Sequence, residues 1–324
     1  MKRRRCLAIA VIWAATLGPA GLAAAERPGW TARGARIELE RVISTRHDLA
    51  TRRDAVIAWL MGKEDEPLFR RPYGVAWDGS DLLVADPAAH RVTRVAGTTI
   101  RSSREGAVED PVGVAVCNAG IFVTDARAGA VAVLNHNLQR TRWLASNLSR
   151  PTGIACSGDD IFVVETAAHR VLVMDSRGAV KRIIGGRGEG AGEFNYPTSI
   201  AVAGQFLFVG DTLNFRVQRI DLLTGAQVIA FGTNGDAAGN MPRVKGIAVD
   251  AQHHIWITDA HLDQIAIYTA EGEFLVAIGR TGFAPGELSF PAGIAFAEDG
   301  RIAVADSLNG RVQIFRLLGA GGME

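Results

Sequence analysis

A short pattern recurs six times along this 324-residue chain, and it constrains the fold more than any other feature. Its fullest copy runs from Gly185 to Val217 and contains a glycine-rich loop, a proline and two apolar runs, the second of which ends in Asp211. Arg216, five residues after that acid, opens a third run. Because repeated units of this length bury their apolar faces against neighbouring copies, the repeat overrides the two domains that length alone suggests.

The copies align at two positions. Their opening runs begin 39 to 47 residues apart, at Pro72, Pro111, Pro151, Pro197, Val244 and Pro291. In every copy the second run ends in an acid, and these acids are Asp86, Asp125, Glu165, Asp211, Asp259 and Asp306. Several short strands in each unit of roughly 40–50 residues are typical of a propeller blade. We therefore predict an all-β fold, a six-bladed β-propeller over residues 68–324.

The sixth copy lacks a fourth strand of its own, because the chain ends soon after the run 311–317. An empty outer position would leave unpaired backbone groups. Residues 36–44 alternate as a strand does, so we predict that they complete the last blade and close the ring. In the same extension, 26–67, residues 26–35 read as a polar, poorly ordered leader, and the pattern of residues 48–61 predicts a short helix capped by Asp48.

Residues 1–25 have the order of a secretory signal peptide: basic residues, an apolar run and small residues before a cleavage point. An uncleaved anchor is the alternative, although the apolar run is short for a membrane span. We expect a periplasmic or secreted protein with no stable membrane anchor after cleavage. Removing this segment leaves 31 basic residues against 34 acidic ones, and this balance argues against nucleic-acid binding.

Two cysteines, Cys117 and Cys156, remain after cleavage, each at the end of an opening run in neighbouring copies. They lie one step out of register, so we expect their side chains to point to opposite faces and to behave as small buried apolar groups. A disulfide between them is the alternative in an oxidising compartment.

The copies resemble NHL repeats. The resemblance rests on the Gly-rich run with Phe-x-x-Pro-x-x-Ile-Ala at residues 185–201 and on Asp-Ser-Leu-Asn-Gly-Arg-Val at residues 306–312. Residues 63–77 are similar to the entry of the first blade in exported bacterial NHL-repeat proteins of unknown function. The resemblance implies a six-bladed ring that serves for recognition, as a sensor domain or, in relatives, as an enzyme, so it narrows the fold far more than the activity.

The acid of each blade and an arginine five residues later predict structural loop pairs, because a catalytic residue is needed once and not in most blades. These pairs are Asp86 with Arg91, Glu165 with Arg170, Asp211 with Arg216, and Asp306 with Arg311. We expect no catalytic residue, since the chain has no Gly-x-Ser-x-Gly motif.

The leading hypothesis is a non-catalytic scaffold or binding module, monomeric and without a cofactor, that recognises a protein or peptide. Propeller loops from different blades surround one axis, which makes them a suitable platform for recognition. The predicted ligand-binding face consists of Tyr73, His90, His169, Asn214, Phe215, Lys245 and Asn309.

The alternative is a metal-dependent lyase or hydrolase at the channel mouth. His90, His169 and His261 follow the blade acids, and three imidazoles could hold zinc, or calcium with oxygen ligands. The arrangement is similar to that of lyases that cleave peptidyl-hydroxyglycine, which use an Asp-x-x-x-His loop. Those lyases take further histidines from the position after the blade proline, where this chain has none.

Overall fold

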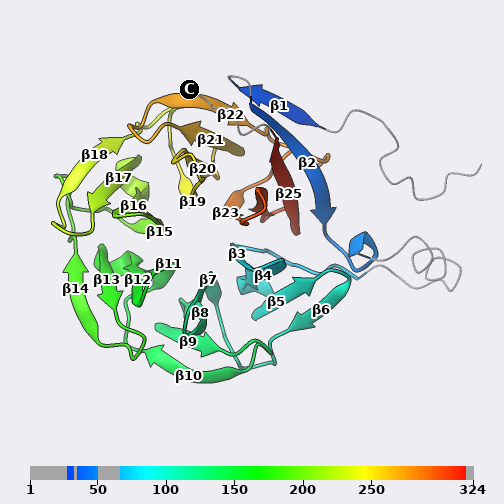
Figure 1. Cartoon of the computed structure of the whole chain (residues 1–324), viewed down its shortest axis with the longest axis horizontal. Helices are drawn as coiled ribbons and strands as arrows, with labels where there is room; N and C mark the ends of the chain where they lie inside the picture. The colour runs from blue at the N-terminus through cyan, green and yellow to red at the C-terminus, as the bar shows by residue number, and fades with distance from the viewer. Residues whose placement is uncertain (1–27, 33–34, 50–65, 319–324) are drawn as a thin grey trace, which may run out of the picture.

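The computed structural model describes residues 28–32, 35–49 and 66–318. Six antiparallel sheets stand around a central axis like the blades of a propeller (Figure 1), which confirms the predicted all-β, six-bladed fold. The predicted signal peptide and most of the predicted helix 48–61 lie outside the described residues. The start of that helix is a 3-10 turn, η1 (His47–Leu49). No helix in the described part of the chain is long and apolar enough to cross a bilayer.

Blades 1 to 5 each contain four consecutive strands, ordered from the axis outward. Blade 1 has β3 (Gly74–Asp78), β4 (Asp81–Asp86), β5 (Arg91–Ala96) and β6 (Thr99–Ser102). Blade 2 has β7 (Pro111–Cys117), β8 (Gly120–Asp125), β9 (Ala130–Leu134) and β10 (Arg140–Ala145). Blade 3 has β11 (Pro151–Ser157), β12 (Asp160–Glu165), β13 (Arg170–Met174) and β14 (Val180–Ile184). Blade 4 has β15 (Pro197–Ala203), β16 (Phe206–Asp211), β17 (Arg216–Asp221) and β18 (Gln227–Phe231), and blade 5 has β19 (Val244–Val249), β20 (Ile255–Asp259), β21 (Gln264–Tyr268) and β22 (Phe274–Ile278).

Blade 6 joins the two ends of the chain. Its inner strands are β23 (Pro291–Phe296), β24 (Arg301–Asp306) and β25 (Arg311–Leu318), and β2 (Ala35–Ile43) pairs antiparallel with β25. Ile37 lies opposite Leu317, and Ile43 lies opposite Val312. The alternating side chains of β2 are buried at Ile37 and Leu39, so the strand contributes to the core as well as to the hydrogen-bond ladder. This arrangement confirms the predicted closure of the ring by the N-terminal strand.

The leader before β2 is not without structure, contrary to the prediction. Residues of β1 (Gly29–Ala32) pair with β2 and add a fifth strand to the outer edge of blade 6. Trp30 is the physical reason: its ring lies 5.8 Å from that of Phe315, centroid to centroid. This aromatic contact adds to the four residue pairs of the ladder and stabilises a strand that is too short to show an alternating pattern.

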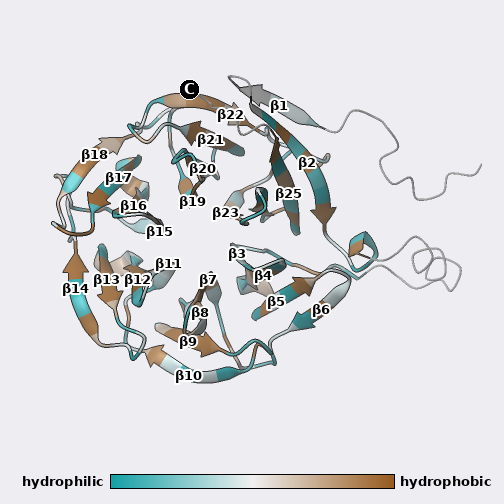
Figure 2. Cartoon of the chain, in the orientation of Figure 1, coloured by the Kyte–Doolittle hydropathy of each residue, from teal (hydrophilic) through white to brown (hydrophobic). Residues whose placement is uncertain are grey.

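The hydrophobic core is divided into layers between adjacent blades. Successive side chains of a strand point to opposite faces of its sheet, so each blade packs on the preceding blade with one face and on the following blade with the other. Figure 2 shows apolar colour concentrated on the second and third strands, while the outermost strands alternate with polar residues. One layer, between blades 3 and 4, contains Phe162, Val164, Phe194 and Leu207.

The third residue of each opening run lies where the blades approach most closely. Five of the six residues there are glycines, and the ring they form, the glycine ring, consists of Gly74, Gly113, Gly153, Ser199, Gly246 and Gly293. A Cβ atom at Gly113 would lie 2.3 Å from the carbonyl oxygen of Thr152 in the next blade. Backbone therefore packs directly on backbone around the axis, and a side chain is excluded at most of these positions.

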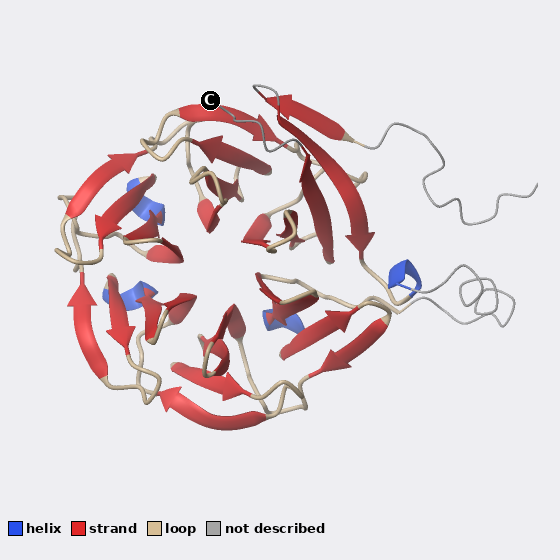
Figure 3. Ribbon diagram, viewed as in Figure 1, coloured by secondary structure: helices blue, strands red, loops and turns tan. Residues whose placement is uncertain are grey.

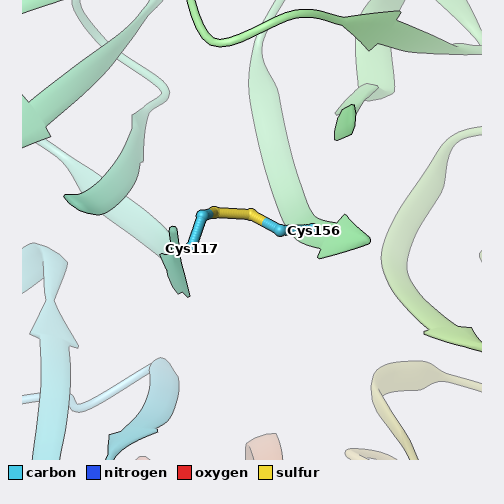
Figure 4. The surroundings of a disulfide bond; sticks show 2 residues. All are labelled: Cys117 and Cys156. Atoms are coloured by element: carbon cyan, nitrogen blue, oxygen red, sulfur yellow. A yellow bond between two sulfur atoms is a disulfide. The ribbon is translucent and has the colours of Figure 1, made fainter. Parts of the chain in front are cut away.

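Cys117 of β7 and Cys156 of β11 form a disulfide between blades 2 and 3 (Figure 4), with their Cα atoms 5.8 Å apart. The expectation that they remain unpaired is wrong, and so is the argument from register. Two cysteines on opposite faces of one sheet could not meet, but these belong to two sheets. A side chain directed forward from blade 2 meets one directed backward from blade 3, so opposite orientations bring the two sulfur atoms into the same layer.

Candidate functional site

The acid that ends each second strand is buried and fixes the loop in front of the first strand of the same blade. Asp86 accepts hydrogen bonds from the backbone amides of Arg70 and Arg71, at 2.6 and 3.1 Å. Asp259 accepts one from the amide of Arg243 at 2.7 Å. A buried carboxylate requires such donors because water is excluded from it. The repeated acid therefore sets the position of the residue that precedes each first strand.

Three of the four predicted loop pairs are ion pairs in the structure. The Arg170 guanidinium lies 2.6 Å from Glu165, that of Arg216 lies 2.8 Å from Asp211, and that of Arg311 lies 2.6 Å from Asp306. The fourth prediction needs correction: no ion pair joins Asp86 to Arg91 among the described residues. Arg91 donates to the carbonyl oxygen of Leu68 at 2.8 Å instead, and the oxygens of Asp86 already accept backbone amides.

The residue four positions after each acid has a left-handed backbone in all six blades. These residues, with φ between 51° and 61°, are His90, Gly129, His169, Phe215, Asp263 and Gly310. In blades 1, 3 and 4 they close the 3-10 turns η2 (Pro87–Ala89), η3 (Thr166–Ala168) and η4 (Thr212–Asn214), the short helices beside the inner strands in Figure 3. Sharp turns of this kind need a residue that tolerates positive φ. The geometry of this turn therefore explains the similar sequences around His90 and His169.

Two of these turn residues also hold a residue of the next blade. His169 accepts a hydrogen bond from the amide of Tyr196 at 3.2 Å, and its ring lies edge-on to the Tyr196 ring, with 4.4 Å between centroids. Asp263 accepts the amide of Phe290 at 2.6 Å. Both bonds span 27 residues and reach the same position of the repeat. His169 thus positions Tyr196 and does not itself face a ligand.

The residues directly before the six opening runs form one ring around the channel mouth, which we call the rim. The rim consists of Arg71, Asp110, Arg150, Tyr196, Arg243 and Phe290, and all six line one cavity of about 680 Å³. The three arginines come from blades 1, 3 and 5, so cations alternate with Asp110 and the two aromatic residues. Arg150, Tyr196 and Phe290 have φ values of 54°, 49° and 53°. Such values are uncommon for bulky residues and often mark functional positions.

Two residues further along the chain, a second ring forms the floor of this cavity. Its members, which also line a smaller cavity of about 90 Å³ next to the glycine ring, are Tyr73, Val112, Thr152, Thr198 and Lys245. The threonine hydroxyls are used within the ring: Thr152 bonds to Thr166 and Thr198 bonds to Thr212, both at 2.7 Å. Lys245 has no hydrogen bond or ion pair within the described ranges, so its donors are available.

The cavity is strongly basic. Five cationic side chains line it against one carboxylate, that of Asp110, and they are Arg71, Arg127, Arg150, Arg243 and Lys245. Burial lowers the pKa of Lys245 to about 8, with further contributions from Arg243 and Arg150, and Asp259 opposes the shift. Burial raises the pKa of Tyr73 to about 12, although Arg150 and Arg243 oppose it. At neutral pH the floor therefore presents a neutral phenol and a poorly solvated ammonium group.

The predicted ligand-binding face divides into two groups. Tyr73, His90 and Lys245 line the cavity. The other four residues are absent from its lining and support the loops: Asn214 donates to Asp211 and to the carbonyl of Gly188, Asn309 donates to Asp306 and to the carbonyl of Gly282, and His169 and Phe215 close turns. Sequence reasoning missed the rim arginines. The signal for them was their shared position directly before an opening run of the repeat.

The three histidines of the metal hypothesis do not meet. The Nδ1 atom of His90 contacts the carbonyl oxygen of Glu109, His169 holds Tyr196, and His261 is exposed with its Nε2 atom 3.8 Å from Asp236. Across residues 28–32, 35–49 and 66–318, no group of three or more His, Cys, Asp or Glu side chains is arranged to hold a metal ion.

Two family descriptions match parts of the chain. Residues 145–222 match a family described as a 6-bladed beta-propeller, and residues 288–315 match the NHL repeat. No curated protein matches the chain.

Solved structures with the same fold have different functions in their names. A streptogramin B lyase is 18% identical with a TM-score of 0.58, covering 77% of this chain and 94% of its own. A gluconolactonase from Xanthomonas campestris is 16% identical with a TM-score of 0.60, covering 90% and 99%. An auxiliary nutrient binding protein from Bacteroides ovatus is 12% identical with a TM-score of 0.62, covering 78% and 71%. At these identities the similarity shows the fold alone. The blade count and the two matches together show that the chain folds as a six-bladed β-propeller and carries an NHL repeat at residues 288–315.

Proposed function

We propose that this chain is an exported, non-catalytic binding propeller that recognises an acidic peptide segment of a protein partner at the mouth of its channel. The observation that carries the proposal is the basic cavity of about 680 Å³, which the rim and floor rings line together. A cavity of this size is within the usual range for ligand sites. Its walls combine arginines with aromatic rings, the residue types that dominate the energetics of binding sites.

The charge of the cavity favours an anionic ligand. The whole chain is nearly neutral, with a formal net charge of +1, while the cavity gathers five cations around one carboxylate. Arginines from three alternating blades surround the axis and can approach several carboxylates from different sides. Arginine is suited to this task because its planar guanidinium group forms paired hydrogen bonds with carboxylates.

The enzyme alternative has weaker support in this chain. Two of the structures that share the fold are named as a lyase and a lactonase, and a third is named as a nutrient-binding protein. The histidines that would hold a catalytic metal are separated and engaged in different contacts. The nutrient-binding name, in contrast, belongs to the same kind of function as the one proposed.

Export is part of the proposal and rests on the order of residues 1–25. The disulfide between Cys117 and Cys156 supports it, because structural disulfides persist in oxidising compartments such as the periplasm. Fractionation of cells that produce the full chain tests this part: we expect the protein outside the cytoplasm, about 2–3 kDa lighter than the full chain after cleavage of a segment of this length. Full-length protein retained in the cytoplasm would contradict it.

A direct binding measurement tests recognition. A fluorescent hexaglutamate peptide is titrated with the protein at low salt, where electrostatic attraction is least screened. Replacing both Arg150 and Arg243 by alanine should weaken binding by roughly tenfold or more, since each removes a charged hydrogen-bond donor. The matched control is the double substitution Arg142→Ala and Arg177→Ala, which removes the same charge at exposed positions absent from the cavity lining. Equal losses in both variants, or no binding by the wild-type protein, would contradict the proposal.

A further inference from the structure

The cavity is a well that narrows at its far end. Beyond the floor residues, the channel narrows to the second cavity of about 90 Å³, which the glycine ring surrounds. Backbone atoms of adjacent blades are already in close contact there, since a Cβ atom at Gly246 would lie 2.4 Å from the carbonyl oxygen of Ala292. The remaining space holds only a few water molecules, each of which occupies about 30 Å³ in the liquid. A peptide that enters the well from the mouth therefore meets a constriction directly beyond the floor residues.

A lysine without a hydrogen-bond partner among the described residues lies at the floor of this well. Lys245 belongs to the floor ring, lines both cavities and has no hydrogen bond or ion pair to any described residue. An ammonium group has three N–H donors, and partial burial reduces the hydration of this one. Arg243 and Arg150 stand in the rim above it. One anionic group at the floor would satisfy the ammonium donors.

We propose that the well takes the C-terminal end of the partner's acidic segment, with the terminal carboxylate bound by Lys245 and the preceding acidic side chains bound by the rim arginines. The inference rests on the proposed function and deepens it. A chain end fits a well that narrows to this extent better than a through-running segment does. A carboxylate at that end meets the cation at the floor.

The electrostatic surroundings of Lys245 support this assignment. The groups that act on its ammonium are Arg243 and Asp259 of its own blade and Arg150 of blade 3, and the phenol of Tyr73 lines the same floor from blade 1. Burial and the two arginines lower its pKa to about 8. A bound carboxylate compensates the like charges and favours the protonated lysine, so binding is coupled to proton uptake above about pH 8.

Two peptides that differ only at the C-terminus test the inference. Both carry an N-terminal dye and the sequence Glu-Glu-Glu-Ala-Ala, one as the free acid and one as the amide. At pH 7 we expect the free acid to bind roughly tenfold more tightly or better, the value of one charged hydrogen-bonded contact. Lys245→Met should remove this difference, and Lys245→Arg should retain part of it. Arg71→Ala, a change at the rim, should weaken both peptides by the same factor.

The outcomes separate the two proposals. If both peptides bind with equal affinity to the wild-type protein, the terminal-carboxylate site is wrong while the acidic-peptide function stands. If neither binds, both are wrong. Acetate and inorganic phosphate are added as competitors, because a free anion could satisfy the same lysine. If either binds in a Lys245-dependent way as tightly as the free-acid peptide, the occupant is a small anion and the inference is overturned. Single-stranded RNA that displaces the peptide at equal concentration would overturn it too. Circular dichroism of each variant confirms that it is folded.

Discussion

The glycine ring and the rim lie only three residues apart in each repeat, yet they differ in almost every respect. The glycine ring has one residue type at five of its six positions, whereas the rim has Arg, Asp, Arg, Tyr, Arg and Phe. Residues of the glycine ring contact the backbone of the next blade, and those of the rim line the cavity. A position that makes the same contact six times is under the same steric limit six times. A position that faces the cavity is free of that limit and can differ from blade to blade.

The buried acids connect the two rings. They repeat because they fix a loop, as Asp125 does by accepting the amides of Glu109 and Asp110 at 2.6 and 3.0 Å. By fixing that loop they also aim the rim side chain into the cavity. Repetition in this protein therefore marks the scaffold, and the variation held in place by the scaffold marks the site.

The largest effect is expected from a methyl group in the glycine ring. Gly113→Ala places a Cβ 2.3 Å from the carbonyl oxygen of Thr152, and a backbone atom in a closed ring cannot easily move away. We expect a loss of about 3 kcal/mol in the free energy of unfolding, at the upper end for overpacking. The control is Gly186→Ala, where no atom lies within 4 Å of the added carbon. Chemical denaturation of the two variants gives the comparison, and equal midpoints would contradict the steric account.

A smaller effect of opposite sign is expected at the floor. The pKa of Lys245 is about 8 in the folded protein and 10.5 in an ordinary lysine. The unfolded chain therefore binds more protons between these values, so this lysine destabilises the fold in full below pH 8, and the penalty disappears as the pH rises toward 10.5. Lys245→Met should raise stability at pH 7 by on the order of 1–3 kcal/mol.

Melting curves of the wild-type protein and Lys245→Met, recorded from pH 7 to pH 10, check this prediction. Their difference in Tm should shrink as the pH increases through 8. Tyr73 titrates alike in both proteins and cancels in the difference. A variant that is less stable than the wild type at pH 7 would show that the ammonium group has a stabilising partner, which would weaken the case for an open binding position.

The smallest effect is expected at the rim. Arg71 is exposed, and its contact with the scaffold is made by its backbone amide, which alanine retains. Arg71→Ala should therefore change the free energy of unfolding by less than about 0.5 kcal/mol while it weakens binding of the acidic peptide. A large loss of stability in Arg71→Ala would contradict the view that the rim side chains are not part of the scaffold.

Much of the fold could be predicted from the sequence because the residues that recur in each copy of the repeat have a steric or electrostatic function. The six acids and the missing fourth strand of the last copy determined both the number of blades and the closure by β2. Strand β1 was not predicted because its four residues are too few to show an alternating pattern. The disulfide was not predicted because the position of a residue within its strand does not determine how two neighbouring sheets face each other.

The site was harder to predict, and the reason is physical. Histidines such as His169 attract attention as candidate ligands, but here a left-handed turn explains the position and a backbone amide occupies the ring nitrogen. The rim arginines have no motif of their own, because each is a single residue in a loop. Only the closure of the ring brings Arg71, Arg150 and Arg243 together, and their shared position before the first strand becomes meaningful once the loops are placed around one axis.

The most direct test of the central claim is a titration of the Lys245 ammonium group by heteronuclear NMR, with Lys245→Met used to assign its signal. The account predicts a pKa of about 8 in the free protein. It further predicts a clear upward shift when the free-acid peptide Glu-Glu-Glu-Ala-Ala is added, and a smaller shift with the amide. A lysine that titrates near 10.5, the ordinary value, and does not respond to either peptide would contradict the existence of a carboxylate site at the floor of the well.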